Sequence, residues 1–269
     1  MNDEIQNPKS KIQNPLIVAL DVPTAEQARA LFQELRATGC AFKIGSQLFT
    51  VAGSEFVREL TTAGAKIFLD LKFHDIPNTV ASAGAEAARL NVWMFNVHAS
   101  GGREMMERTA ETVRETAMRE NLTPPKIIAV TVLTSSTASH LREVGVNDEP
   151  LAQVLRLAKL TADSGLDGVV ASALEAAEIK MQNAERRTKT KTERDFLVVT
   201  PGIRFESQIP NPKSQIPNDD QKRTLSPAAA IKAGADYLVV GRPVLEASNK
   251  IETVQEILAE ISSAQAQQN

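Results

Sequence analysis

The sequence is poor in several residue types that particular classes of protein require. It has one cysteine, Cys40, so no disulfide can form within the chain and nothing in it calls for an oxidising compartment. One Trp, one Tyr and nine Phe are too few rings for stacking on single-stranded nucleic acid, and 30 basic against 33 acidic side chains give no excess positive charge for a polyanion. No apolar run reaches the length of about 18 residues that a membrane span needs. We therefore expect a cytoplasmic protein that binds neither nucleic acid nor membrane.

What the chain does contain is a regular alternation of apolar and helical segments. Of its 269 residues 42% are hydrophobic and 23% charged, which is enough apolar material for one large core. Short apolar runs recur eight times between longer segments with helical spacing. The runs lie at 16–21, 40–45, 66–72, 92–98, 126–134, 167–172, 196–202 and 236–242. This alternation favours an α/β fold with a single (β/α)₈ barrel over an open doubly wound sheet.

The first helical segment, 24–37, illustrates the pattern. Thr24 is placed to cap its N-terminus, Gly39 ends it, and one face collects the apolar residues Ala28, Leu31, Phe32 and Leu35. Further helical patterns occupy 47–62, 77–89, 103–119, 149–164, 173–183, 226–233 and 251–262. Outside this alternation, and around a barrel that spans 16–263, we expect a disordered polar leader at 1–15, inserted loops at about 182–194 and 206–220, and a polar tail at 264–269.

The third apolar run carries charged residues on one face. Alternation along 66–72 sends Asp70 and Lys72 together toward the barrel axis, and barrel active sites form at the C-terminal ends of the strands. Asp75 follows three residues later, and Lys43 lies near the end of the second run. Such alternating charges can position a charged substrate and place an ammonium proton beside a reacting atom. A structural ion pair between Asp70 and Lys72 remains the alternative.

The last two runs lead into glycine and arginine, which favour phosphate. Gly202 ends the seventh run and Arg204 follows it, and Gly241 and Arg242 end the eighth, where barrels often bind phosphate groups. Asp21 ends the first run and is placed either to bind a substrate hydroxyl or to cap the next helix. The three histidines lack metal-ligand spacing, and no dinucleotide or P-loop motif occurs, so we expect no metal and no cofactor.

Taken together, these motifs resemble the orotidine 5′-phosphate decarboxylase family. The resemblance covers about 16–249 and is strongest in DLKFHDIPNTV at 70–80. It is supported by LIVALDVP (16–23), FKIGSQLF (42–49), NVHASGG (96–102), VTVLTS (130–135), TPGIR (200–204) and LVVGRPV (238–244). The segment between Arg204 and Gln221 is longer than the family pattern, and DDQKR at 219–223 gives the best match for its glutamine.

The resemblance implies cofactor-free decarboxylation of orotidine 5′-monophosphate to UMP and CO₂, the last step of de novo UMP synthesis. It implies that Lys72 protonates C6 and that Asp70, Asp75 and Lys43 complete the charged network. Asp75 and Thr79 would reach the site of the neighbouring subunit of a homodimer. The other substrate contacts implied are Asp21 and Lys43 at the ribose hydroxyls, Thr134 over the pyrimidine, and Arg204, Gln221, Gly241 and Arg242 at the phosphate and the closing loop.

Two other functions stay open at this stage. One is a Mg²⁺-dependent sugar-phosphate decarboxylase or aldolase, whose similar barrel shares the Asp-x-Lys-x-x-Asp pattern. The other is a non-enzymatic sensor that binds the phosphate of a nucleotide. The continuation HDIPNTV and the TPGIR segment favour the nucleotide decarboxylase.

Overall fold

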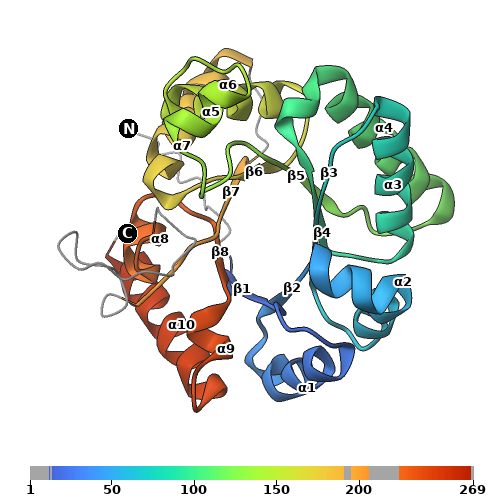
Figure 1. Ribbon diagram of the computed structural model, residues 1–269, viewed down its shortest axis with the longest axis vertical. Helices are drawn as coiled ribbons and strands as arrows, with labels where there is room; N and C mark the ends of the chain where they lie inside the picture. The colour runs from blue at the N-terminus through green and yellow to red at the C-terminus, as the bar shows by residue number, and fades with distance from the viewer. Residues whose placement is uncertain (1–11, 13, 191–194, 206–223, 268–269) are drawn as a thin grey trace, which may run out of the picture.

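A closed parallel barrel forms the centre of the molecule. The computed structural model describes residues 12, 14–190, 195–205 and 224–267. Its strands pair in chain order, and the last pairs with the first, which closes the barrel (Figure 1). They are β1 Leu16–Ala19, β2 Ala41–Gly45, β3 Ile67–Phe73, β4 Met94–His98, β5 Lys126–Val130, β6 Gly168–Val170, β7 Leu197–Thr200 and β8 Tyr237–Val240. The predicted (β/α)₈ architecture is confirmed.

Helices surround the strands and cover the outside of the barrel (Figure 1). They are α1 Ala25–Leu35, α2 Ser46–Thr62, α3 Pro77–Arg89, α4 Gly102–Glu120, α5 Ala138–Glu143, α6 Pro150–Asp163, α7 Ala176–Thr190, α8 Pro227–Lys232, α9 Arg242–Leu245 and α10 Lys250–Ala266. The helical patterns found in the sequence do not include α5 or α9, which are six and four residues long.

Helix α1 forms as its sequence predicts. The Thr24 side chain accepts a hydrogen bond from the backbone N–H of Gln27, and Gly39 adopts the left-handed conformation that ends the following turn. The buried residues of the helix are the four apolar residues of the predicted face, Ala28, Leu31, Phe32 and Leu35. Local capping and apolar spacing therefore suffice to fix this element.

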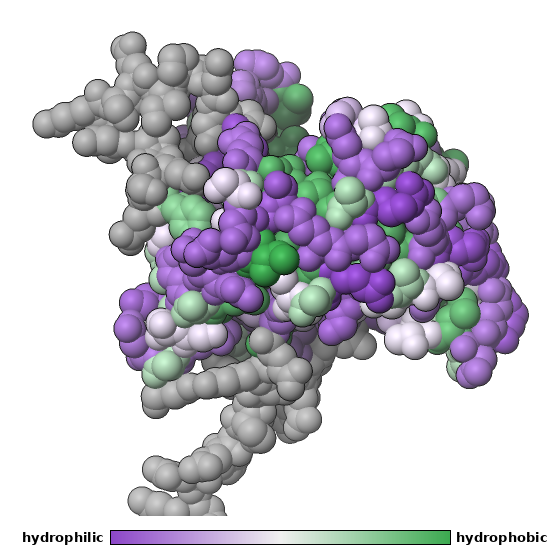
Figure 2. Space-filling model, turned by 90° about the horizontal axis from the view of Figure 1, so that it is seen from below, coloured by the Kyte–Doolittle hydropathy of each residue, from purple (hydrophilic) through white to green (hydrophobic). Residues whose placement is uncertain are grey.

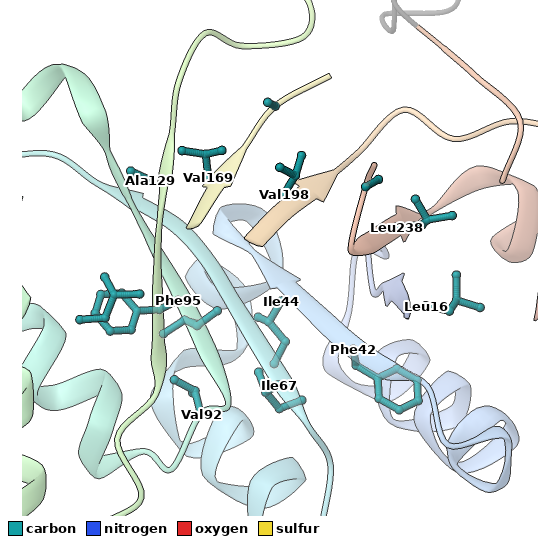
Figure 3. Close-up of a cluster of buried hydrophobic side chains, with 14 of the residues drawn as sticks. Leu16, Phe42, Ile44, Ile67, Val92, Phe95, Ala129, Val169, Val198 and Leu238 are labelled. Atoms are coloured by element: carbon teal, nitrogen blue, oxygen red, sulfur yellow. The ribbon is translucent and has the colours of Figure 1, made fainter. Parts of the chain in front are cut away.

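The apolar core has two layers, one on each side of the barrel wall. Alternate strand residues pack outward against the helices, and Figure 3 shows part of this outer layer, including Phe42, Ile67 and Phe95. The residues between them fill the barrel interior: Ile17, Ala19, Ala41, Phe68, Met94, Ile128, Leu197, Val199, Tyr237 and Val239. Because the interior is packed with side chains, only the end of the barrel remains for a substrate.

The end of the polar leader belongs to the fold. Ile12 and Trp93 both pack against the interior layer of the barrel, and the Trp93 ring lies edge-on to Tyr237 with 5.1 Å between centroids. The side chain of Asn14 donates to the carbonyl of Thr38 at 3.1 Å, and the carbonyl of Pro15 accepts from Leu238 N–H at 2.8 Å. The expected disordered leader is therefore wrong for residues 12, 14 and 15, because backbone pairing and apolar contact hold them; residues 1–11 and 13 lie outside the described residues.

Two further boundary predictions need correction. Helix α7 continues to Thr190, so 182–190 is helix and not part of an inserted loop, because Arg186 ties it to α6 through Asp163 at 2.9 Å and the carbonyl of Ala162 at 2.7 Å. Helix α10 continues to Ala266, because Ala264 is buried in the core, so residues 264–266 are helix and not part of the expected polar tail. The remainder of the first loop, 191–194, and the whole predicted loop 206–220 lie outside the described residues.

Polar residues cover most of the face seen in Figure 2, with hydrophobic residues in smaller groups between them. Among the helices of the described residues, none has the length and apolar character that crossing a membrane requires.

Gly168 of β6 tests how tightly the barrel interior is packed. A Cβ at this position would clash with the carbonyl oxygen of Leu197 on β7 and lie 2.9 Å from its carbonyl carbon. Because these are backbone atoms, Gly168→Ala should lower the free energy of unfolding by about 3 kcal/mol, measured by urea denaturation. The control is Gly64→Ala, where a Cβ meets open space and only the left-handed backbone opposes the change, at about 1 kcal/mol. An equal loss in both variants would contradict the packing argument.

Candidate active site

A cavity of about 510 Å³ opens at the C-terminal ends of the strands. Interior residues such as Phe68, Val130 and Val170 line its apolar part, and charged residues from the strand ends line the rest. Eight of the eleven site residues predicted from the sequence line this one cavity: Asp21, Lys43, Asp70, Lys72, Thr134, Arg204, Gly241 and Arg242. The strand ends therefore gather side chains that are as much as 221 residues apart in sequence.

Four of these residues form a continuous chain of ion pairs. Lys72 Nζ lies 2.7 Å from Asp70 Oδ1, and Lys43 Nζ lies 3.3 Å from Asp70 Oδ2. Lys43 Nζ also donates to Asp21 Oδ1 at 3.0 Å. The Asp70 carboxylate thus binds a different ammonium group on each of its oxygens, as the inward direction of Asp70 and Lys72 predicts.

Burial makes this network costly for the fold. Lys43 and Asp70 are each 9% exposed, and charges removed from water rarely stabilise a protein more than apolar residues would. Burial disfavours the charged form of Lys43, but the negative charges of Asp70 and Asp21 outweigh it and raise the pKa of this ammonium above its ordinary value. Lys43 therefore stays charged, and the network is better explained by chemistry in the cavity than by stability.

The backbone at Lys72 departs from a regular strand. Its φ is 53°, in the left-handed region that side-chain-bearing residues rarely adopt, and the β3–β4 pairing shifts register between Leu69 and Phe73. Such local strain concentrates where a side chain must be aimed at a particular point. Lys72 remains 35% exposed at its side chain, so its ammonium faces the cavity while Asp70 lies beneath it.

Sequence reasoning missed one polar residue that contacts this network. Asn96 of β4 is fully buried, and its side chain bonds both Asp70 and the backbone of Lys72. The sequence does contain a signal for this residue, namely an amide on the inward face of an otherwise apolar strand. Such an amide must find hydrogen-bonding partners inside the barrel.

A further part of the cavity wall, called the arginine wall below, carries Arg204 and Arg242. Arg204 is 8% exposed and follows Gly202, which has a φ of 78°, and Arg242 follows Gly241 at the start of α9. The pairing of Ile203 with Leu225 holds this wall together, with Arg204 N–H donating to the Leu225 carbonyl at 3.1 Å. Two guanidinium groups at one wall suit a dianionic group such as phosphate.

Three of the residues predicted for the site are not among those that line the cavity. Asp75 and Thr79 lie at the exposed start of α3, where the Asp75 carboxylate accepts from the backbone N–H of Ile76 at 2.6 Å. Gln221 lies outside the described residues. Among the described residues no group of His, Cys, Asp and Glu is arranged to hold a metal ion.

Comparison with known proteins gives one consistent result. The family model described as "Orotidine 5'-phosphate decarboxylase / HUMPS family" matches residues 14–257. A protein of Chromobacterium violaceum named orotidine 5′-phosphate decarboxylase is 46% identical and one of that name from Neisseria meningitidis serogroup C is 44% identical, covering 97% and 94% of both chains. The crystal structure of orotidine 5′-phosphate decarboxylase from Lactobacillus acidophilus matches with a TM-score of 0.74 and 34% identity, over 92% of this chain and 98% of that one.

Two histidines beside the network provide a test of its electrostatics. The rings of His74 and His98 lie 5.4 Å apart, and burial, then the neighbouring His74 and Lys72, hold the pKa of His98 below its ordinary value. His74→Gln removes one of these causes, so the pKa of His98 should rise while staying below the ordinary value, as measured by NMR titration. Because the native ring binds a proton less readily than the unfolded chain does, His98 makes the fold less stable as pH falls below that ordinary value. His140→Gln, on exposed α5, is the control and should leave the titration unchanged.

Proposed function

Because the chain belongs to the orotidine 5′-phosphate decarboxylase / HUMPS family, we propose that it converts orotidine 5′-monophosphate to UMP and CO₂, the last step of de novo UMP synthesis. The observation that carries the proposal is the joining of two features in one cavity: the Asp21–Lys43–Asp70–Lys72 chain and a wall with two arginines. The relatives named above favour this reaction over a sugar-phosphate decarboxylase or aldolase of similar fold.

The reaction needs electrostatic help rather than delocalisation. When the bond between C6 and the carboxylate breaks, its electron pair stays in an sp² orbital of C6 that no neighbouring π system overlaps. A fixed positive charge near C6 is then the main means of stabilising the transition state. In the proposal Lys72 supplies this charge and donates its proton to C6, after which water restores the ammonium. Side chains alone supply this chemistry, so the proposal includes no cofactor.

The remaining residues hold the substrate and the proton donor. Asp70 fixes the Lys72 ammonium, and Lys43 with Asp21 binds ribose hydroxyls beside it. Thr134 lies over the pyrimidine, while Arg204, Gly241, Arg242 and Gln221 bind the phosphate and complete closure. Binding at the phosphate end, remote from C6, then contributes to transition-state stabilisation by ordering the site.

A single assay tests the proposed function. The purified chain should consume orotidine 5′-monophosphate, followed by ultraviolet absorbance, and release equimolar UMP and CO₂ in the presence of EDTA. The absence of turnover would refute the proposal and favour a nucleotide-phosphate sensor. Turnover that EDTA abolishes and Mg²⁺ restores would contradict the cofactor-free chemistry.

Replacement of Lys72 tests its role as proton donor. Lys72→Ala should lower kcat by about 10³-fold or more, because it removes both the proton and the positive charge at C6. UMP binding, measured by calorimetry, should persist, since the arginine wall is intact. The matched control is Lys66→Ala, which should keep wild-type turnover. Lys66 is exposed and directly precedes the N-terminal end of β3, the strand that carries Lys72. Wild-type turnover in Lys72→Ala would contradict the assigned role.

We extend the proposal to a homodimer in which Asp75 and Thr79 act in the partner's site. The proposal also includes the cytoplasmic location expected from the sequence. Both residues are exposed outside their own cavity, next to Ile76, a large apolar side chain that is 66% exposed. An exposed apolar residue between two polar ones suits a subunit contact that carries polar groups into a neighbouring site.

Mixed dimers test this arrangement. Lys72→Ala and Asp75→Asn chains, each inactive alone, should regain about a quarter of wild-type activity when unfolded and reassembled together, because half of the dimers are hybrids with one intact site of two. Mixing Lys72→Ala with Asp70→Asn should regain none, since each site of that hybrid keeps one lesion. Equal behaviour of the two mixtures would contradict the shared site.

A further inference from the structure

The pairing of strands β3 and β4 shifts register beside the ion-pair network. Their residues pair as Leu69 with Phe95, and then as Phe73 with Val97. Three residues of β3, from Asp70 to Lys72, therefore lie opposite Asn96 alone. A regular ladder cannot satisfy the backbone groups of such a bulge, so other partners must do so.

The Asn96 side chain supplies one of these partners, at the backbone N–H of Lys72, and also contacts the Asp70 carboxylate. Its Oδ1 accepts from the backbone N–H of Lys72 at 2.8 Å, and its Nδ2 donates to Asp70 Oδ1 at 2.7 Å. Only one orientation of the amide fits, because the opposite one would place an oxygen against a carboxylate and an NH₂ against an N–H. Asn96 is fully buried, so water does not compete for either bond.

Each bond constrains one member of the reactive pair. The bond to Lys72 N–H holds a residue with φ of 53°, a conformation that a lysine does not favour by itself. The bond to Asp70 Oδ1 fixes the carboxylate so that the same oxygen meets Lys72 Nζ, also at 2.7 Å, and the other oxygen faces Lys43. Asn96 does not line the cavity, so it acts on a substrate only through these two residues.

We propose that Asn96 is a positioning residue, which aims the Lys72 ammonium by clamping the Lys72 backbone and the Asp70 carboxylate together. The inference rests on the proposed decarboxylation. Its consequence is a separation of effects: loss of the clamp lowers kcat, while substrate binding at the arginine wall is preserved, since a displacement of about 1 Å at the reacting group costs about 10²-fold in rate.

Asn96→Asp provides the sharpest test because it is isosteric and still accepts from Lys72 N–H. Above neutral pH its carboxylate faces Asp70, which lies between the ammonium groups of Lys43 and Lys72, while His98 follows two residues along the chain. The introduced carboxylate cannot donate a hydrogen bond to Asp70. We expect kcat to fall by about 10²-fold at pH 8 with KM near the wild-type value. At lower pH the introduced carboxyl takes a proton, which it donates to Asp70, so the deficit relative to wild type should shrink.

Asn96→Ser is the second variant and covers the case in which Asn96→Asp does not fold. A serine hydroxyl is too short to make both bonds, so kcat should fall at every pH without recovery in acid. Thr109→Val on α4, which removes another fully buried hydrogen-bonding group away from the cavity, is the control for stability and should keep wild-type kcat.

The outcomes separate the two proposals. An inactive wild-type chain would overturn the proposed function. If the wild type is active, a folded Asn96→Ser with wild-type kcat, or a deficit in Asn96→Asp that stays constant from pH 8 to acid, would overturn the positioning role. Equal losses of kcat in Asn96→Ser and Thr109→Val would overturn it as well, because they would reflect destabilisation alone.

Discussion

The site depends on a carboxylate that is shared by two ammonium groups where little water reaches. Asp70 contacts Lys72 through one oxygen and Lys43 through the other, and Lys43 is held in turn by Asp21. Neither Asp70 nor Lys43, each 9% exposed, could be buried there alone, because each would lack a counter-ion. The network therefore forms as a unit.

The barrel separates this costly chemistry from the contacts that stabilise the fold. Apolar layers fill its interior and its outer wall, and the contacting rings of Trp93 and Tyr237 do not line the cavity. The charges gather where the strands end. The stability that the apolar layers provide can thus offset the cost of the strained backbone of Lys72 and of the burial of its neighbours. The charged residues of the site need not themselves stabilise the fold.

Periodicity and capping predicted the parts of this structure that are local. The α1 cap at Thr24 and its apolar face follow from spacing within one turn or two, and the inward direction of Asp70 and Lys72 follows from strand alternation. The β3–β4 bulge could not be predicted in this way, because it depends on the register of two strands. The continuation of α7 past residue 182 depends likewise on Arg186 meeting Asp163 of another helix, which no single segment encodes. Asn96 falls between these cases. Its place on the inward face of the fourth strand could be predicted from the sequence, but the groups that it bonds could not.

The pairing of Ile203 with Leu225 brings together two points separated by 21 intervening residues beside the arginine wall. A chain segment whose ends are already joined gains length at a cost that rises only with the logarithm of its size. Insertions beyond Arg204 can therefore accumulate over evolutionary time with little effect on it, since its N–H bond to the Leu225 carbonyl anchors its backbone at the junction. Sequence drift and catalytic constancy can thus coexist within one connection of the barrel.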